Sequence, residues 1–346
     1  MHDPHSGRMS AGETRAAGGL ALVFAFRMLG MFMVLPVLAT YGMDLQGATP
    51  ALIGLAIGAY GLTQAVLQIP FGMLSDRIGR LPVIYVGLLI FAAGAVLAAS
   101  ADSIWGVIAG RVLQGAGAIS AAVMALLSDL TREQHRTKAM AMIGMSIGLS
   151  FAVAMVVGPL LTRAYGLSGL FLATAAMAIV GLLIVALVVP RAGAQWLHRR
   201  SGVPTPAVSA TLRHPDLLRL DLGIFVLHAI LMASFVALPL ALVANGGLPK
   251  EEHWWVYLTA LLVGFFAMIP FVGAAAIWVP VCLVLYFHDE RPMAALVLAG
   301  YCTAVVSMVD NVLKPYILHG QANLHPLLAL LSVIGGVQVL GPIGIL

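Results

Sequence analysis

The sequence GMLSDRIGR, residues 72–80, lies between two long apolar stretches and decides the fold. It carries Asp76, Arg77 and Arg80, with Gly72 and Gly79 beside them. Three charges within five residues are too costly to place in hydrocarbon. We therefore predict a tight turn at a membrane surface that joins one spanning helix to the next.

The composition places the rest of the chain in a lipid bilayer. Of its 346 residues, 61% are hydrophobic and 9% are charged, whereas a soluble domain has about 25% charged residues. A spanning helix needs about 20 apolar residues, and the sequence offers such segments at 18–41, 51–71, 83–101, 104–129, 139–161, 168–190, 219–244, 254–270, 272–287, 293–309 and 325–346. We predict an all-α polytopic membrane protein with about 10–11 spans.

The basic residues indicate the sidedness of the chain. Lys and Arg are retained on the cytoplasmic side of a membrane. If the N-terminus is cytoplasmic, the outer loops up to residue 253 hold only Arg163 and Lys250. The inner segments then hold Arg8, Arg15, Arg77, Arg80, Arg132, Arg136, Lys138, Arg191, Arg199, Arg200, Arg213 and Arg219. We predict an inner (cytoplasmic) membrane protein with a cytoplasmic N-terminus, and we assign its net charge of +4 to topology rather than to a nucleic-acid partner.

The spacing G-x-L-x-D-R-x-G-R resembles the loop signature between the second and third helices of the major facilitator superfamily. In that family the loop latches the two halves of a transporter at the cytoplasmic side. The resemblance implies a cytoplasmic gating loop made of Gly72, Asp76, Arg77, Gly79 and Arg80, with Asp129 within reach of an arginine. Leu81 replaces a usual basic residue of the signature, which weakens the implied latch.

Two further strings, FAFRMLG at 24–30 and FVALP at 235–239, resemble the drug/proton antiporter branch of this superfamily. The resemblance implies a six-helix N-terminal domain over 1–190, a cytoplasmic linker over 191–218, and the first two helices of a second domain over 219–270.

The resemblance changes in the last part of the chain. No charged residue occurs between Pro270 and Asp289, and the string VDNVLKP at 309–315 resembles the C-terminal part of the autoinducer-exporter permease family. We expect two families to be joined near 268–273, with a truncated helical segment of the second family over 271–346. A divergent facilitator is the alternative.

Two arginines lie inside predicted spans. Arg27 is nine residues into the first span and Arg111 about eight into the fourth, which is about 12–14 Å deep at 1.5 Å per residue. Such charges usually face a cavity or a partner, although a long side chain can also reach the nearer surface. The string RVLQG at 111–115 resembles the superfamily's R-x-x-x-G motif, whose arginine is associated with proton coupling and substrate positioning.

Other polar residues share these spans. Tyr60, Gln64 and Gln68 recur every four residues and share one helical face, where they line a wet cavity or hydrogen-bond to neighbouring helices. His228 is either a titrating group or a structural histidine. We predict a transport cavity made of Arg27, Tyr60, Gln64, Gln68, Arg111, Gln114 and His228.

Gly158 and Pro159 resemble the end of the antiporter motif g-x-x-x-G-P, with Ala154 in place of the first glycine. Proline removes a helical hydrogen bond and kinks the helix, so either an antiporter motif or a generic kink is expected here.

The resemblance implies a secondary active transporter that exports small hydrophobic or drug-like molecules by alternating access, driven by proton entry. Protons, a small-molecule substrate and the bilayer are the expected partners of a monomer. We expect no enzyme activity, cofactor or metal, because no nucleophile–base set, phosphate-binding glycine loop or metal cluster is evident in the sequence. The alternatives are a non-transporting chimeric or truncated membrane protein, and an exporter of a small signalling molecule.

Overall fold

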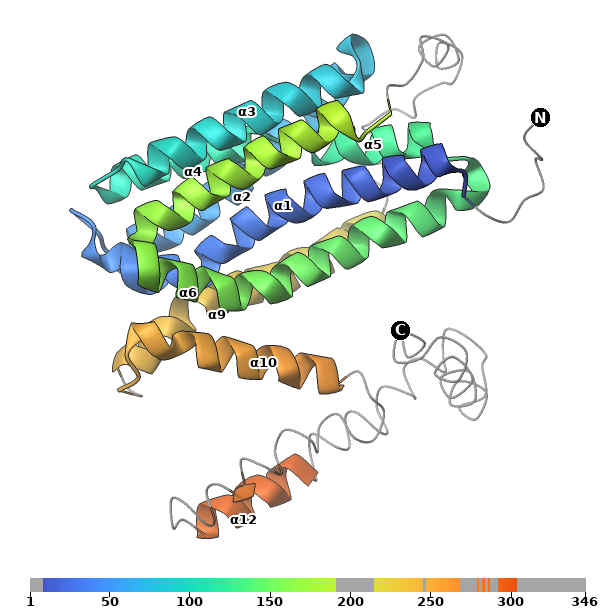
Figure 1. Ribbon diagram of the computed structural model, residues 1–346. Helices are drawn as coiled ribbons and strands as arrows, with labels where there is room; N and C mark the ends of the chain where they lie inside the picture. Colours follow the sequence, from blue (N-terminus) through green and yellow to red (C-terminus); the bar gives the residue numbers. More distant parts are fainter. Residues whose placement is uncertain are drawn as a thin grey trace, which may run out of the picture. The chain divides into compact units, whose positions relative to one another are not determined.

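The computed structural model describes residues 9–190, 215–244, 247–267, 279, 282–283, 286 and 292–303, which are almost entirely helical (Figure 1). The chain divides into two compact units, Met1–Trp254 and Trp255–Leu346. The first unit contains α1 (Ala11–Tyr41), η1 (Gly42–Asp44), α2 (Pro50–Ile78), α3 (Arg80–Ala99), α4 (Ile104–Ala116), α5 (Ser120–Leu130), α6 (Glu133–Leu187), α9 (Pro215–Ala244) and η2 (Lys250–Glu252). The second contains most of α10 (His253–Ala267) and all of α12 (Pro292–Tyr301).

Six segments of the described chain are long and apolar enough to cross a membrane. They are Ala11–Asp44, Pro50–Ile78, Arg80–Ala99, Ile104–Leu130, Glu133–Leu187 and Leu217–Ala244. The all-helical prediction is therefore confirmed. The junction expected near 268–273, the linker residues 191–214 and the string at 309–315 lie outside the described residues.

Three of the predicted spans have a different form in the structure. The span predicted at 104–129 consists of two helices, α4 and α5, separated by residues 117–119. The spans predicted at 139–161 and 168–190 are both present in α6, joined at Gly166, whose φ of 69° and ψ of −176° are not helical.

The turn predicted at residues 72–80 is much shorter than expected. Helix α2 continues through Ile78, and α3 begins at Arg80. Only Gly79 lies between them, with a φ of 98° that side-chain-bearing residues rarely adopt. Most of the polar string therefore forms the last two turns of α2, and a single glycine reverses the chain.

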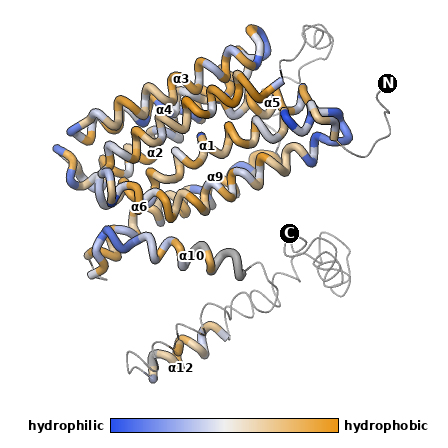
Figure 2. The backbone as a smooth tube through the Cα atoms, in the orientation of Figure 1, coloured by the Kyte–Doolittle hydropathy of each residue, from blue (hydrophilic) through white to orange (hydrophobic). Residues whose placement is uncertain are grey.

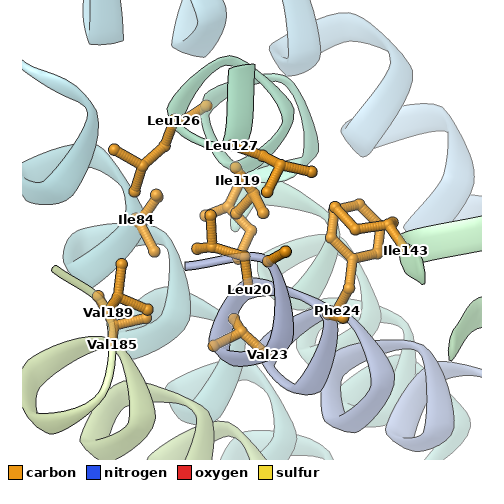
Figure 3. Close-up of a cluster of buried hydrophobic side chains, with 14 of the residues drawn as sticks. Leu20, Val23, Phe24, Ile84, Ile119, Leu126, Leu127, Ile143, Val185 and Val189 are labelled. Atoms are coloured by element: carbon orange, nitrogen blue, oxygen red, sulfur yellow. The ribbon is translucent and has the colours of Figure 1, made fainter. Parts of the chain in front are cut away.

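The core of the first unit lies between α1, α3, α5 and α6 (Figure 3). Its side chains include Leu20, Val23, Phe24, Ile84, Ile119, Leu126, Leu127, Ile143, Val185 and Val189, all buried. Apolar residues occur along most of the length of these helices (Figure 2), and many of them are exposed. On α3, for example, Val86 and Leu89 are each 52% exposed. Apolar residues on both faces are what a bundle in lipid requires.

Glycines bring the backbones of α3 and α4 into contact. A Cβ on Gly94 would lie 2.5 Å from the Gln114 backbone nitrogen, and one on Gly110 would lie 2.7 Å from the Gly94 oxygen. A Cβ on Gly117 would lie 2.4 Å from the Gly87 oxygen. Small residues at helix contacts of this kind are typical of membrane bundles.

Candidate functional site

Arg80 is the centre of a polar cluster where α2, α3 and α5 meet. Its guanidinium forms an ion pair with Asp76, lies 2.5 Å from Ser75 Oγ and lies 3.5 Å from the Asp129 carboxylate. Ser75 is buried, and its hydroxyl donates to the Gly72 carbonyl at 2.7 Å. The prediction that Asp129 lies within reach of an arginine is confirmed, and Ser75 is an additional partner that the sequence did not indicate.

The other members of the predicted gating loop have different positions. Arg77 is exposed, whereas Arg80 is the arginine that turns inward. Gly72 faces α5, since a Cβ there would contact the Ala121 Cβ at 3.4 Å. Gly79 supplies the chain reversal between α2 and α3.

A second polar contact joins α1 to the segment between α5 and α6. Glu13 is 6% exposed and accepts hydrogen bonds from the Arg132 backbone at 2.8 Å and from its side chain at 3.0 Å. These bonds raise the pKa of Arg132. Glu13 also forms a capping box with Ser10 at the start of α1. Sequence reasoning missed this pair, although the spacing S-x-x-E before an apolar run is a known capping signal.

Arg111 lies inside the bundle rather than at its surface. It is 1% exposed, donates to Gln114 Oε1 at 3.0 Å and to the Ala56 carbonyl at 3.4 Å, and lies 4.6 Å from the centre of the Tyr60 ring. The guanidinium therefore does not reach toward the nearer surface, which was the alternative reading. Its proximity to Gln114 is confirmed.

Arg27 is buried to the same degree and also bonds only to neutral groups among the described residues. It donates to Ser120 Oγ at 3.1 Å, to Gln64 Oε1 at 3.2 Å and to the Gly117 carbonyl at 3.2 Å. Its guanidinium lies 5.7 Å from the centre of the Phe91 ring. These neutral partners keep a charged group in an apolar interior.

The polar stripe on α2 contacts both arginines. Tyr60 lies beside Arg111, and Gln64 accepts a bond from Arg27. Buried polar atoms without a described hydrogen-bond partner remain at the Tyr60 hydroxyl, Gln68 Oε1, Gln114 Nε2 and Arg27 Nε. The structure thus brings six of the seven predicted cavity residues onto neighbouring helices α1, α2 and α4.

His228 does not join this group. It is exposed on α9, and its Nδ1 lies 2.9 Å from the carbonyl of Ile224, four residues earlier.

Gly158 brings α6 close to α1. A Cβ there would lie 2.7 Å from the Met33 carbonyl oxygen, so the absence of a side chain at Gly158 allows the two helices to pack closely. The backbone remains helical at Pro159, and the large departure occurs at Gly166 instead. The antiporter role of this motif stays a prediction.

At the end of α1 opposite Glu13, the helix is linked to the turn before α10. Lys250 Nζ lies 2.6 Å from Asp44 Oδ2 and 4.7 Å from the centre of the Tyr41 ring. Sequence reasoning did not find this ion pair, because Asp44 and Lys250 are 206 residues apart.

No group of three His, Cys, Asp or Glu residues within the described part of the chain could hold a metal ion.

The sequence of this chain matches a family of membrane transporters. A family model described as Major Facilitator Superfamily matches residues 20–344. Inner membrane transport protein YajR of Escherichia coli (strain K12) is 59% identical over 265 residues, which cover 77% of this chain and 58% of that protein. Multidrug resistance protein D of the same organism is 34% identical over 147 residues, or 41% of this chain and 36% of that protein.

A solved structure has the same fold. It is a bacterial homologue of the human lysosomal transporter Spinster, in an inward-facing and occupied conformation. The TM-score is 0.60 with 14% identity, covering 96% of this chain and 85% of that chain. The family match also includes most of residues 271–346, for which a second family was expected. The likeness of that segment to autoinducer exporters stays a prediction.

Proposed function

Because the chain belongs to the major facilitator superfamily, whose members are membrane transporters and not enzymes, we propose that it exports small, largely apolar molecules across the inner membrane by alternating access, coupled to proton entry. The Arg80 cluster carries this proposal. It ties the α2–α3 turn to the end of α5 through Asp76 and Asp129, as a latch at one end of a six-span domain would.

The buried polar residues fit a site for molecules that are largely apolar. Arg111 lies beside the aromatic ring of Tyr60 and donates to the side-chain amide of Gln114. Amides and rings can orient a ligand with few charges, as in many small-molecule sites. The similarity to a multidrug resistance protein supports the same substrate class.

Proton coupling needs a group within the membrane that can gain and lose a proton. Within residues 18–190 the carboxylates are Asp44, Asp76, Asp102, Asp129 and Glu133, which all lie at or near helix ends. On α9, His228 is the described histidine that lies within a candidate span.

The test is transport by the purified full chain in proteoliposomes with an imposed pH gradient and a fluorescent hydrophobic dye. We expect dye movement that stops when a protonophore collapses the gradient. Arg111→Gln should lower the rate at least about tenfold, since a buried charge with two hydrogen bonds is lost. Arg163→Gln, an exposed arginine on α6, is the matched control and should leave the rate unchanged.

Two outcomes would contradict the proposal. Well-folded protein that moves no dye under any gradient would favour the non-transporting alternative. Dye movement that ignores the gradient would support transport but not proton coupling. Export of a signalling molecule remains a weaker candidate, since its support is the string at 309–315, outside the described residues.

A further inference from the structure

The fourth predicted span is interrupted within the apolar bundle. Helix α4 ends at Ala116 and α5 begins at Ser120, in the middle of the apolar segment 104–130. Gly117 is buried, and a buried carbonyl without a hydrogen bond is costly. The Gly117 carbonyl accepts bonds from the Ile119 backbone at 2.9 Å and from Arg27 at 3.2 Å.

One guanidinium therefore holds both sides of this break. From α1, Arg27 bonds to Gly117 just after α4 and to Ser120 Oγ at the start of α5. It also bonds to Gln64 on α2 and lies over Phe91 on α3. Arg27 is thus the described side chain that connects the break to three other helices.

The two halves of the span are packed in different ways. Helix α4 contacts the backbones of two neighbouring helices directly. Gly94 and Gly110 bring it against α3, and Gly115 brings it against α2, since a Cβ there would lie 2.3 Å from the Tyr60 carbonyl oxygen. Such backbone contacts leave little freedom to slide. Helix α5 packs through side chains such as Val123 and Leu126 in the core cluster.

We infer that Arg27 is a positioning residue that fixes the direction of α5 relative to α4, and thereby the place of Asp129 in the Arg80 cluster. Asp129 follows Ser120 by nine residues on the same helix, about 14 Å away at 1.5 Å per residue. A small tilt at the break therefore moves Asp129 toward or away from Arg80. The role of Arg27 in transport rests on the proposed function, whereas its role in holding α5 does not.

Hydrogen exchange of the full chain in lipid nanodiscs tests whether Arg27 fixes α5 relative to α4. Arg27→Gln should speed amide exchange over residues 117–130 by about tenfold, the usual effect of losing a buried bond to a charged group. Arg27→Lys should restore part of the protection. Ser120→Ala, a milder change, should raise exchange in the same segment by a smaller factor. Arg111→Gln is the matched control, because Arg111 bonds to Ala56 and Gln114 but not to the break.

The inference is overturned if Arg27→Gln leaves exchange over 117–130 at the wild-type rate, or if exchange rises equally in α6. In the transport assay, Arg27→Gln should lower kcat with KM unchanged, and a raised KM with unchanged kcat would instead mark Arg27 as a substrate contact. If the wild-type chain moves no dye, the proposed function fails while the exchange measurement still decides the role of Arg27.

Discussion

Gly94 shows how strongly a single residue can set the packing of this bundle. Its missing side chain lets α4 approach so closely that a Cβ would lie within 2.7 Å of two backbone atoms of α4, at Gln114 and Gly110. Backbone atoms cannot rotate away as a side chain can, so the helices themselves must separate to accept a methyl group.

We predict that Gly94→Ala lowers the thermal unfolding temperature in detergent, with a cost of about 1–3 kcal/mol from overpacking. Gly148→Ala is the matched control, because nothing lies within 4 Å of a Cβ at that helical position. Alanine favours the helix over glycine, so this control should be neutral or slightly stabilising. Equal unfolding temperatures for both variants would show that the α3–α4 contact is looser than described.

At the scale of helices, the ion pair of Glu13 and Arg132 fixes the start of α1 against the segment between α5 and α6. Glu13 is nearly buried and receives both backbone and side-chain bonds from Arg132. The segment between α5 and α6 comes just after Asp129. It is therefore held by α1 through Glu13 and by the Arg80 cluster through Asp129.

A double-mutant cycle with Glu13→Gln and Arg132→Gln tests this link. Each single change should lower the free energy of unfolding, and the double variant should lose less stability than the two single variants added together. We expect a small positive coupling between the two side chains, since residues in contact couple whereas distant ones add. Thermal unfolding at low and high salt is the measurement. Additive losses would mean that the pair contributes nothing beyond two independent side chains.

At the scale of the molecule, the Asp44–Lys250 pair links the end of α1 opposite Glu13 to the turn between α9 and α10. In an alternating-access transporter this link must break when that end opens. In a chain with Cys282→Ser and Cys302→Ser, we predict that a short bis-methanethiosulfonate reagent joining Asp44→Cys to Lys250→Cys stops transport. Reduction of the two disulfides that the reagent forms should restore transport. The two single-cysteine variants are the controls. A cross-linked chain that still transports at the wild-type rate would show that this link does not move.

Much of the membrane architecture follows from sequence alone, because apolar length and the cost of charges in lipid act locally. The turn between the second and third spans is such a case, whereas the contact of an arginine with Asp129 was implied by the family resemblance. The break after α4 was not predicted, since Gly117, Ala118 and Ile119 are all compatible with a continuous spanning helix. It arises from contacts with distant residues, namely Gly87 and Arg27.

The sequence predicted which residues belong to the interior site, but not which of their side chains contact one another. Helical spacing placed Tyr60, Gln64 and Gln68 on one face, yet it could not show that Tyr60 lies beside Arg111 while Gln64 bonds to Arg27. Those pairings depend on how α1, α2 and α4 are rotated against one another. His228 was grouped with them from its depth in a span, which carries no information about lateral position.

Cysteine labelling in intact cells tests the central claim, that the α2–α3 turn is a cytoplasmic latch of a transporter. In a chain with Cys282→Ser and Cys302→Ser, Ile78→Cys places a thiol at a 55% exposed position beside the latch. Asp102→Cys, in the exposed turn at the other end of α3, is the control. We predict that a membrane-impermeant maleimide labels Asp102→Cys in intact cells but labels Ile78→Cys only after permeabilisation. Labelling of Ile78→Cys in intact cells would contradict the account.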